Sequence, residues 1–187
     1  MEANPLFYAK ILLFGEYGII KDAMGLSIPY NFYQGAFKST THLEGVAKNS
    51  NAHLINYLNH LQSITDSGEI LGALDLEAFK TDIENGLYFD SSIPQGFGVG
   101  SSGALVAAIY NRYAVNKITA EGNMDREDLI QLKKIFSQME SYFHGKSSGI
   151  DPTICYLNLP LLIKSKDDLG TVEIPESTEG KGAIFLL

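Results

Sequence analysis

The sequence predicts one domain that mixes strands with helices, and three observations support this. Segments rich in aromatic and branched apolar residues occur at 6–14, 26–39 and 87–94, as is typical of strands. Apolar residues recur at helical spacing over 49–64 and again over 125–144. A length of 187 residues, 45% of them hydrophobic, is enough to bury a core and is typical of a single domain.

The first half of the chain is expected to contain three strands and two helices. The strand at 6–14 ends at the turn sequence GEYG, and 26–39 is extended because it is rich in aromatic residues. The helix at 49–64 is followed by one at 75–86, which starts with aspartate and stops with glycine. The strand at 87–94 then leads into a glycine-rich stretch.

The second half is expected to begin with helices and end with strands. A helix of small residues covers 101–114, and a longer helix runs over 125–144 from an aspartate suited to the N-cap position. The segment 144–152 is predicted as a loop. The segments 153–165 and 170–175 have the composition of strands.

The composition favours a small-molecule partner. A net charge of −8 without a Lys/Arg-rich run argues against a surface for nucleic acid or for an anionic membrane. The single cysteine, Cys155, excludes an internal disulfide, and the N-terminal apolar run ILLF is too short for a signal or membrane segment. We therefore interpret the protein as cytoplasmic. The sequence does not determine an oligomeric state and leaves a homodimer open.

The C-terminal end of the sequence is unusual for a complete domain. It reads GKGAIFLL, an apolar run with the composition of a strand and no polar residues after it. Because native domains usually finish in polar or tied-down segments, we interpret the chain as a fragment of a longer protein.

The stretch PQGFGVGSSGA, residues 94–104, is the first candidate for a functional site. Its segment 98–103 satisfies G-x-G-x-x-G, follows a strand and opens a helix, as a dinucleotide-binding loop does. No apolar strand follows that helix, so the dinucleotide interpretation fails. No lysine follows Gly103, so the loop G-x-x-x-x-G-K-[ST] is absent as well.

Phosphate binding remains an interpretation of this stretch on general physical grounds. Glycines let backbone N–H groups approach phosphate oxygens, and a helix N-terminus adds partial positive charge. Ser101 and Ser102 offer hydroxyls to phosphate or to hydrated Mg²⁺. The alternative is a glycine-rich turn before a helix that packs closely through Ala104, Ala107 and Ala108.

A second candidate lies in ESYFHGKSSGID, where Glu140 and Asp151 flank a glycine-containing bend. At about 100° per residue, Glu140 falls beside the apolar stripe of its helix, so its carboxylate is expected to face inward. Two carboxylates joined in this way can converge, one on a metal and the other on a proton. The alternative is a solvated helical acid and an ordinary turn aspartate.

A third candidate is Lys10 with Glu16 in AKILLFGEYG. A lysine in an apolar strand either extends its ammonium to water or pairs with an acid. An ammonium near a reacting hydroxyl would favour alkoxide character and stabilise phosphate charge. The alternative is a purely structural role, which a lone lysine in a strand favours.

Together and in this order, the three segments resemble the GHMP kinase superfamily. AKILLFGEYGII is similar to its first motif, PQGFGVGSSGA to its phosphate loop, and HGKSSGID to the loop with the catalytic aspartate, most closely as in mevalonate kinases. The resemblance implies an α+β domain of the ribosomal protein S5 domain 2-like fold. It also implies that residues 1–187 are the N-terminal, ATP-binding domain, with 170–187 as the start of a truncated C-terminal domain.

The resemblance implies the following roles, with ATP and Mg²⁺ as cofactors. Lys10 and Asp151 would be catalytic, with Lys10 near the substrate hydroxyl and Asp151 receiving or orienting its proton. Ser102 and Glu140 would hold Mg²⁺. The ATP phosphates would be wrapped by the backbone of Gly96, Gly98, Gly100, Ser101, Ser102 and Gly103. Substrate or structural support would come from Glu16, Tyr17 and His144.

The expected function is phosphoryl transfer from ATP to the hydroxyl of a small metabolite, with mevalonate as the favoured substrate. Two departures from the family bear on this. Tyr17 stands where mevalonate kinases have histidine, and GEY there resembles phosphomevalonate kinases instead; nothing after Pro152 resembles the family's third motif. The alternatives are therefore a phosphomevalonate kinase or another GHMP kinase, and, from another class, an inactive nucleotide-binding module.

Overall fold

The computed structural model describes residues 4–15, 24–68, 70–120, 124–165 and 168–173. Its elements, in chain order, are β1 (Phe7–Phe14), β2 (Gly25–Ser39), α1 (Gly45–Asp66), α2 (Leu76–Glu84), β3 (Leu87–Ser91), α3 (Ser101–Tyr113), α4 (Arg126–His144), α5 (Ile150–Leu157), β4 (Leu161–Ser165) and β5 (Asp168–Thr171). The predicted mixture of strands and helices is confirmed.

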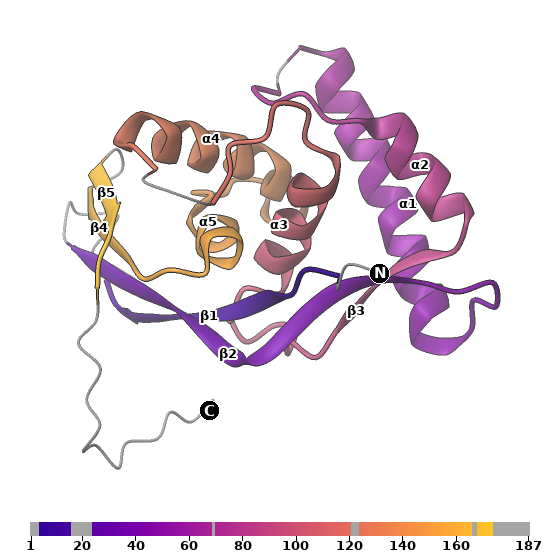
Figure 1. Cartoon of the computed structure of the whole chain (residues 1–187), viewed down its shortest axis with the longest axis horizontal. Coiled ribbons are helices and arrows are strands. Elements are labelled where there is room, and N and C mark those ends of the chain that lie inside the picture. Colours follow the sequence, from indigo (N-terminus) through magenta and orange to yellow (C-terminus); the bar gives the residue numbers. More distant parts are fainter. Residues whose placement is uncertain (1–3, 16–23, 69, 121–123, 166–167, 174–187) are drawn as a thin grey trace.

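The long strand β2 organises the sheet. It pairs antiparallel with β1 along one side, and on its other side with β4 at its start and β3 at its end. Strand β5 extends the sheet beyond β4, and the five strands form one antiparallel sheet. The helices lie on one face of this sheet, with α3 and α5 above β1 and β2 and with α1 and α2 toward the β3 end (Figure 1).

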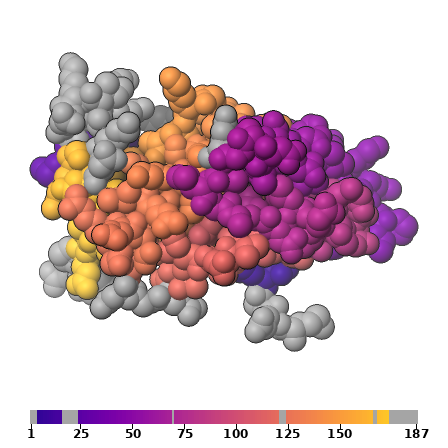
Figure 2. Space-filling view, turned by 90° about the horizontal axis from the view of Figure 1, so that it is seen from above, coloured from indigo at the N-terminus to yellow at the C-terminus, as the bar shows by residue number. Residues whose placement is uncertain are grey.

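The helices form a nearly continuous layer. Seen from above, they cover the face of the sheet, and strands reach the surface only toward the edges (Figure 2). Helix α3 is central in this layer, and its small residues Ala104, Ala107 and Ala108 are fully buried. These alanines thus pack closely, as the alternative interpretation of the glycine-rich stretch also required. None of the helices that the structure describes is both long enough and apolar enough to span a bilayer.

The capping signals were correctly interpreted in two helices. The Asp75 carboxylate accepts a hydrogen bond from the Ala78 N–H at 2.9 Å, and Asp125 caps α4 through the Asp128 N–H at 2.8 Å. Such caps satisfy amide groups that have no partner within the helix.

The region after α4 differs from the prediction. Residues 150–157 form helix α5, so the predicted loop ends earlier and the predicted strand at 153–165 is wrong except for β4. A short apolar run buried on all sides has the same composition in a helix as in a strand. Gly149, at φ +74°, precedes the helix, and Pro152 lies in its first turn, where no N–H is needed.

Two smaller differences concern strand ends. Strand β3 ends at Ser91, before the predicted boundary, and β5 covers Asp168–Thr171 rather than 170–175. The predicted terminal strand GKGAIFLL lies outside the residues that the structure describes.

Candidate functional site

Lys10 and Asp151 form an ion pair between β1 and α5. The Lys10 Nζ atom lies 2.9 Å from Asp151 Oδ2, and the side chains are 8% and 35% exposed, respectively. The lysine is therefore paired with an acid rather than extended into water. Its described partner is Asp151, whereas Glu16 and Tyr17 lie outside the described residues.

Glycines at the N-cap and in the first turn of α3 let the elements around this ion pair approach closely. A Cβ atom at Gly100 would lie 2.9 Å from Lys10 Cγ and 3.3 Å from Cys155 Sγ. A Cβ atom at Gly103 would lie 2.9 Å from the Asp151 carbonyl carbon. The Lys10 N–H also donates to the Val99 carbonyl at 3.0 Å, which ties β1 to the loop. The loop and the ion pair thus form one packed unit.

The backbone before α3 has the features of an anion site. Gly96, Gly98 and Gly100 have φ values of +84°, +66° and +83°, a region that favours glycine. Gly100 is the N-cap of α3 and supplies no side-chain cap, and the first turn contains no acidic residue. Free amide groups at a helix N-terminus attract phosphate oxygens. The segment therefore fits a phosphate group.

A second cluster lies beside the N-terminus of α3. Ser102 Oγ donates to Glu140 Oε1 at 3.1 Å and lies 3.2 Å from His144 Nε2. Ser147 Oγ donates to the other oxygen, Glu140 Oε2, and accepts from the Gly149 N–H at 3.0 Å. Glu140 is only 4% exposed, as its position beside the apolar stripe of α4 predicts.

Burial raises the pKa of Glu140, and the nearby negative charge of Asp151 raises it further. The hydrogen bonds from Ser147 and Ser102 and the charge of His144 lower the pKa and offset part of this effect. Two hydroxyl donors thus hold the carboxylate, but its negative charge remains unfavourable because it is buried and near Asp151. A bound cation would reduce this unfavourable energy.

The donor set suits Mg²⁺ better than a metal that needs an all-protein cage. Among the described residues, no group of three or more His, Cys, Asp or Glu side chains is arranged to hold a metal. Mg²⁺ commonly binds one or two carboxylates and keeps waters and substrate phosphates as its other ligands. Ser102 and Glu140, next to the anion site, fit that pattern.

The Glu140→Gln variant is expected to be more stable than the parent chain at pH 7 without divalent cations, by about 1 kcal/mol. Because the folded pKa is raised, the folded state binds a proton more tightly than the unfolded state. The stabilisation of the folded state by this proton is complete below the ordinary pKa of glutamate. It is lost as pH rises through the raised pKa that Glu140 has in the folded state. Glutamine carries no charge to bury, so the stability of Glu140→Gln relative to the parent chain should increase over that pH range.

Urea unfolding in EDTA at several pH values measures this difference. Glu173→Gln, a change at an exposed acid outside any helix or strand, is the control and should show no such pH dependence. A Glu140→Gln variant less stable than the parent at pH 7 would contradict the prediction.

The structure adds two residues that the sequence reasoning missed. Ser147 contacts Glu140 directly, but in the sequence it is one of two adjacent serines in HGKSSGID, and no pattern distinguishes them. Cys155 is buried behind the ion pair, with its Sγ 3.8 Å from the Gly100 carbonyl oxygen. Burial raises its pKa well above the ordinary value, so it acts here as an uncharged packing group.

The fold and the site define a class of protein. The family profile described as the GHMP kinases N terminal domain matches residues 64–158, just over half of the chain. The chain therefore belongs to the GHMP kinase family, and its fold is the mixed N-terminal domain of that family.

Individual relatives agree with this assignment. A mevalonate kinase of Archaeoglobus fulgidus is 29% identical over 150 residues, which cover 78% of this chain and 47% of the relative. The crystal structure of the Methanococcus jannaschii mevalonate kinase matches with a TM-score of 0.51 at 16% identity, over 92% of this chain and 56% of that one. Another mevalonate kinase structure matches with a TM-score of 0.50 at 15% identity, over the same shares. The chain thus spans about half the length of these relatives.

Proposed function

We propose that this chain carries the ATP-binding part of a small-molecule kinase and that mevalonate is its substrate. The observation that carries the proposal is the Lys10–Asp151 ion pair at 2.9 Å, packed against the glycine loop that opens α3. Family membership and the 29% identical mevalonate kinase support the choice of reaction and substrate. Bound ATP and Mg²⁺ would supply the transferable phosphoryl group and neutralise its charge.

The phosphate-binding role is assigned to the backbone from Gly96 to Gly103. These residues would bind the phosphates through amide groups at the N-terminus of α3. Ser102 and Glu140 would hold the cation, and Ser147 would keep the Glu140 carboxylate oriented through its hydrogen bond. His144 would support Ser102 from 3.2 Å.

The proton-handling role is assigned to Asp151. Its Oδ2 is held by Lys10 in a charge-assisted bond, which fixes the orientation of the carboxylate. At 35% exposure the side chain is accessible to a substrate. Oδ1 would accept the proton that the substrate hydroxyl loses, and the Lys10 ammonium would stabilise negative charge on the reacting oxygen.

Two measurements test the proposal. Calorimetry with ATP and Mg²⁺ tests nucleotide binding, and coupled ADP release tests mevalonate, phosphomevalonate, homoserine and galactose as substrates. Turnover with mevalonate supports the proposal. Turnover with another of these compounds instead would identify that compound as the substrate in place of mevalonate. Binding without turnover indicates the nucleotide-binding module, and the absence of ATP binding overturns the proposal.

A further inference from the structure

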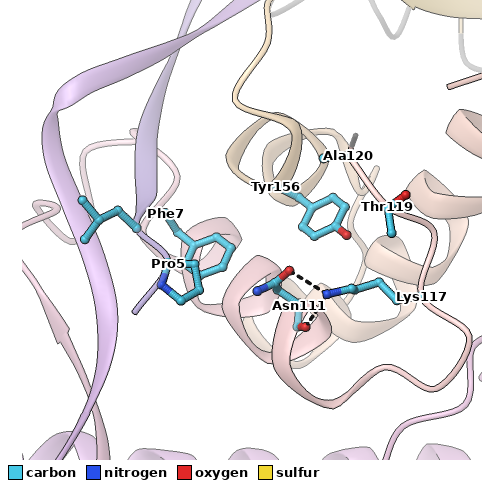
Figure 3. A pocket seen from close by; sticks show the side chains of 8 residues that line it. Pro5, Phe7, Asn111, Lys117, Thr119, Ala120 and Tyr156 are labelled. Carbon is cyan, nitrogen blue, oxygen red and sulfur yellow. Dashed lines mark hydrogen bonds between the residues drawn. The ribbon is translucent and has the colours of Figure 1, made fainter. Parts of the chain in front are cut away.

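Figure 3 shows a cavity whose lining includes Phe7, Asn111 and Tyr156. Its volume is about 240 Å³, and a neighbouring hollow of about 210 Å³ shares Pro5, Phe7 and Asn111 with it. The wall comes from the segment leading into β1, the C-terminal half of α3, the connection after α3, and α5. It is lined by Pro5, Leu6, Phe7, Asn111, Lys117, Thr119, Ala120 and Tyr156.

This cavity is separate from the phosphate-binding segment. Ser102 and Asn111 are nine residues apart on α3, which corresponds to about 13 Å along a helix that rises 1.5 Å per residue. The elements β1, α3 and α5 nevertheless contribute residues both to the candidate kinase site and to the cavity. Each of β1, α3 and α5 carries a candidate kinase residue and also a residue of the cavity wall.

The Lys117 ammonium gives the cavity a positive charge. Its Nζ donates to the Asn111 carbonyl oxygen at 3.0 Å and to Asn111 Oδ1 at 3.1 Å, both uncharged acceptors. Among the described residues, none that lines the cavity is acidic, and none of the ion pairs includes Lys117. Because an ammonium has three donors, one remains for a ligand.

The rest of the wall suits an apolar body. Phe7 and Tyr156 contribute rings that are 5% and 8% exposed, and Pro5 and Leu6 add apolar surface. The Tyr156 hydroxyl already donates to the Ile118 carbonyl oxygen at 2.7 Å, and Figure 3 shows its ring beside Lys117 and Asn111. An apolar cavity of about 150 Å³ accommodates benzene. A volume of about 240 Å³ therefore has room for a ring and a small charged group.

We propose that this cavity binds a small organic anion with a single negative charge and an apolar body, such as an aryl or branched-chain monocarboxylate. Lys117 is the cationic side chain of the described lining, and its single charge matches a carboxylate, whereas a phosphate dianion carries a second negative charge that no described lining residue balances. The proposal is independent of the kinase reaction, because it uses none of the residues assigned to ATP or Mg²⁺.

The test is a titration of the 187-residue chain with benzoate, followed by amide NMR shifts, with benzyl alcohol as the uncharged probe. Benzoate is expected to shift the amides of Phe7, Asn111, Lys117 and Tyr156 with one saturable curve, and benzyl alcohol to bind at least tenfold more weakly. Shifts that do not saturate, or equal binding of both probes, would overturn the proposal and leave Lys117 as a cap for α3.

Variants separate the charge from the cavity. Lys117→Gln should abolish benzoate binding, Lys117→Arg should retain it, and Ala120→Phe should block it by filling the space while leaving Lys117 in place. Lys48→Gln removes an exposed lysine of α1 and is the matched control. The amide spectrum of each variant without ligand shows whether it folds. Unchanged benzoate binding in folded Lys117→Gln or folded Ala120→Phe would also overturn the proposal.

Discussion

Replacing Lys10 by methionine, or Asp151 by asparagine, is expected to lower turnover of the proposed kinase reaction by about 100-fold or more. That loss corresponds to roughly 3 kcal/mol of transition-state stabilisation. Lys10→Met removes the ammonium that lies 2.9 Å from Asp151, and Asp151→Asn removes the proposed proton acceptor while retaining the shape of the side chain. The measurement is coupled ADP release with saturating ATP and mevalonate.

The chain offers a matched control in a second Lys–Asp pair. Lys38 and Asp90 lie 2.6 Å apart between β2 and β3, with side chains that are 55% and 45% exposed. Lys38→Met breaks the same kind of contact nine residues along β2 from Pro29, the register partner of Lys10, and should leave turnover within about twofold, because exposed ion pairs contribute little. Near-normal rates in both Lys10→Met and Asp151→Asn would refute the assigned mechanism.

Because Lys10 and Asp151 act as a unit, their effects should not add. The double variant is expected to lose little more activity than the worse single variant, since either change already breaks the ion pair. Fully additive losses would indicate that the two side chains act separately. Thermal unfolding of each variant distinguishes a catalytic defect from a failure to fold.

Much of the fold could be predicted because its signals are local. The Asp75 and Asp125 caps depend on residues three positions apart, and the buried stripe of α4 follows from helical spacing. Helix α5 could not be predicted, because its apolar residues are buried against other elements rather than on one face of a regular pattern. Its identity as a helix depends on Gly149 and on packing against α3 and α4.

Several residues of the candidate site could be selected one by one from the sequence, but the contacts between them could not be predicted. Lys10, Glu140 and Asp151 were selected from their positions in the sequence, yet the pairing of Lys10 with Asp151 spans 141 positions and follows from tertiary packing. The inward position of Glu140 follows from its place on the helix, whereas its hydrogen bond with Ser147 depends on the course of the following bend. Residue types suggested the chemistry, and the packing of α3 and α5 determined which groups meet.

The packing at Gly149 predicts a large effect of substitution on stability. Gly149 has a φ of +74°, and an added Cβ atom would collide with the Lys133 carbonyl oxygen and lie 2.7 Å from the Ser137 nitrogen. Both are backbone atoms of α4, so no side-chain rotation relieves the contact. Gly149→Ala is therefore expected to cost about 3 kcal/mol or more, by combining overpacking with an unfavourable backbone conformation.

Gly145 provides a control that separates these two contributions. It also has a positive φ, +71°, but a Cβ atom there would meet nothing within 4 Å. Gly145→Ala should therefore cost only the conformational part, about 1–2 kcal/mol. Urea unfolding of both variants measures the difference. Equal costs would show that α4 and α5 can separate at little expense, and the close contact at Gly149 would then not explain how Asp151 is held against Lys10.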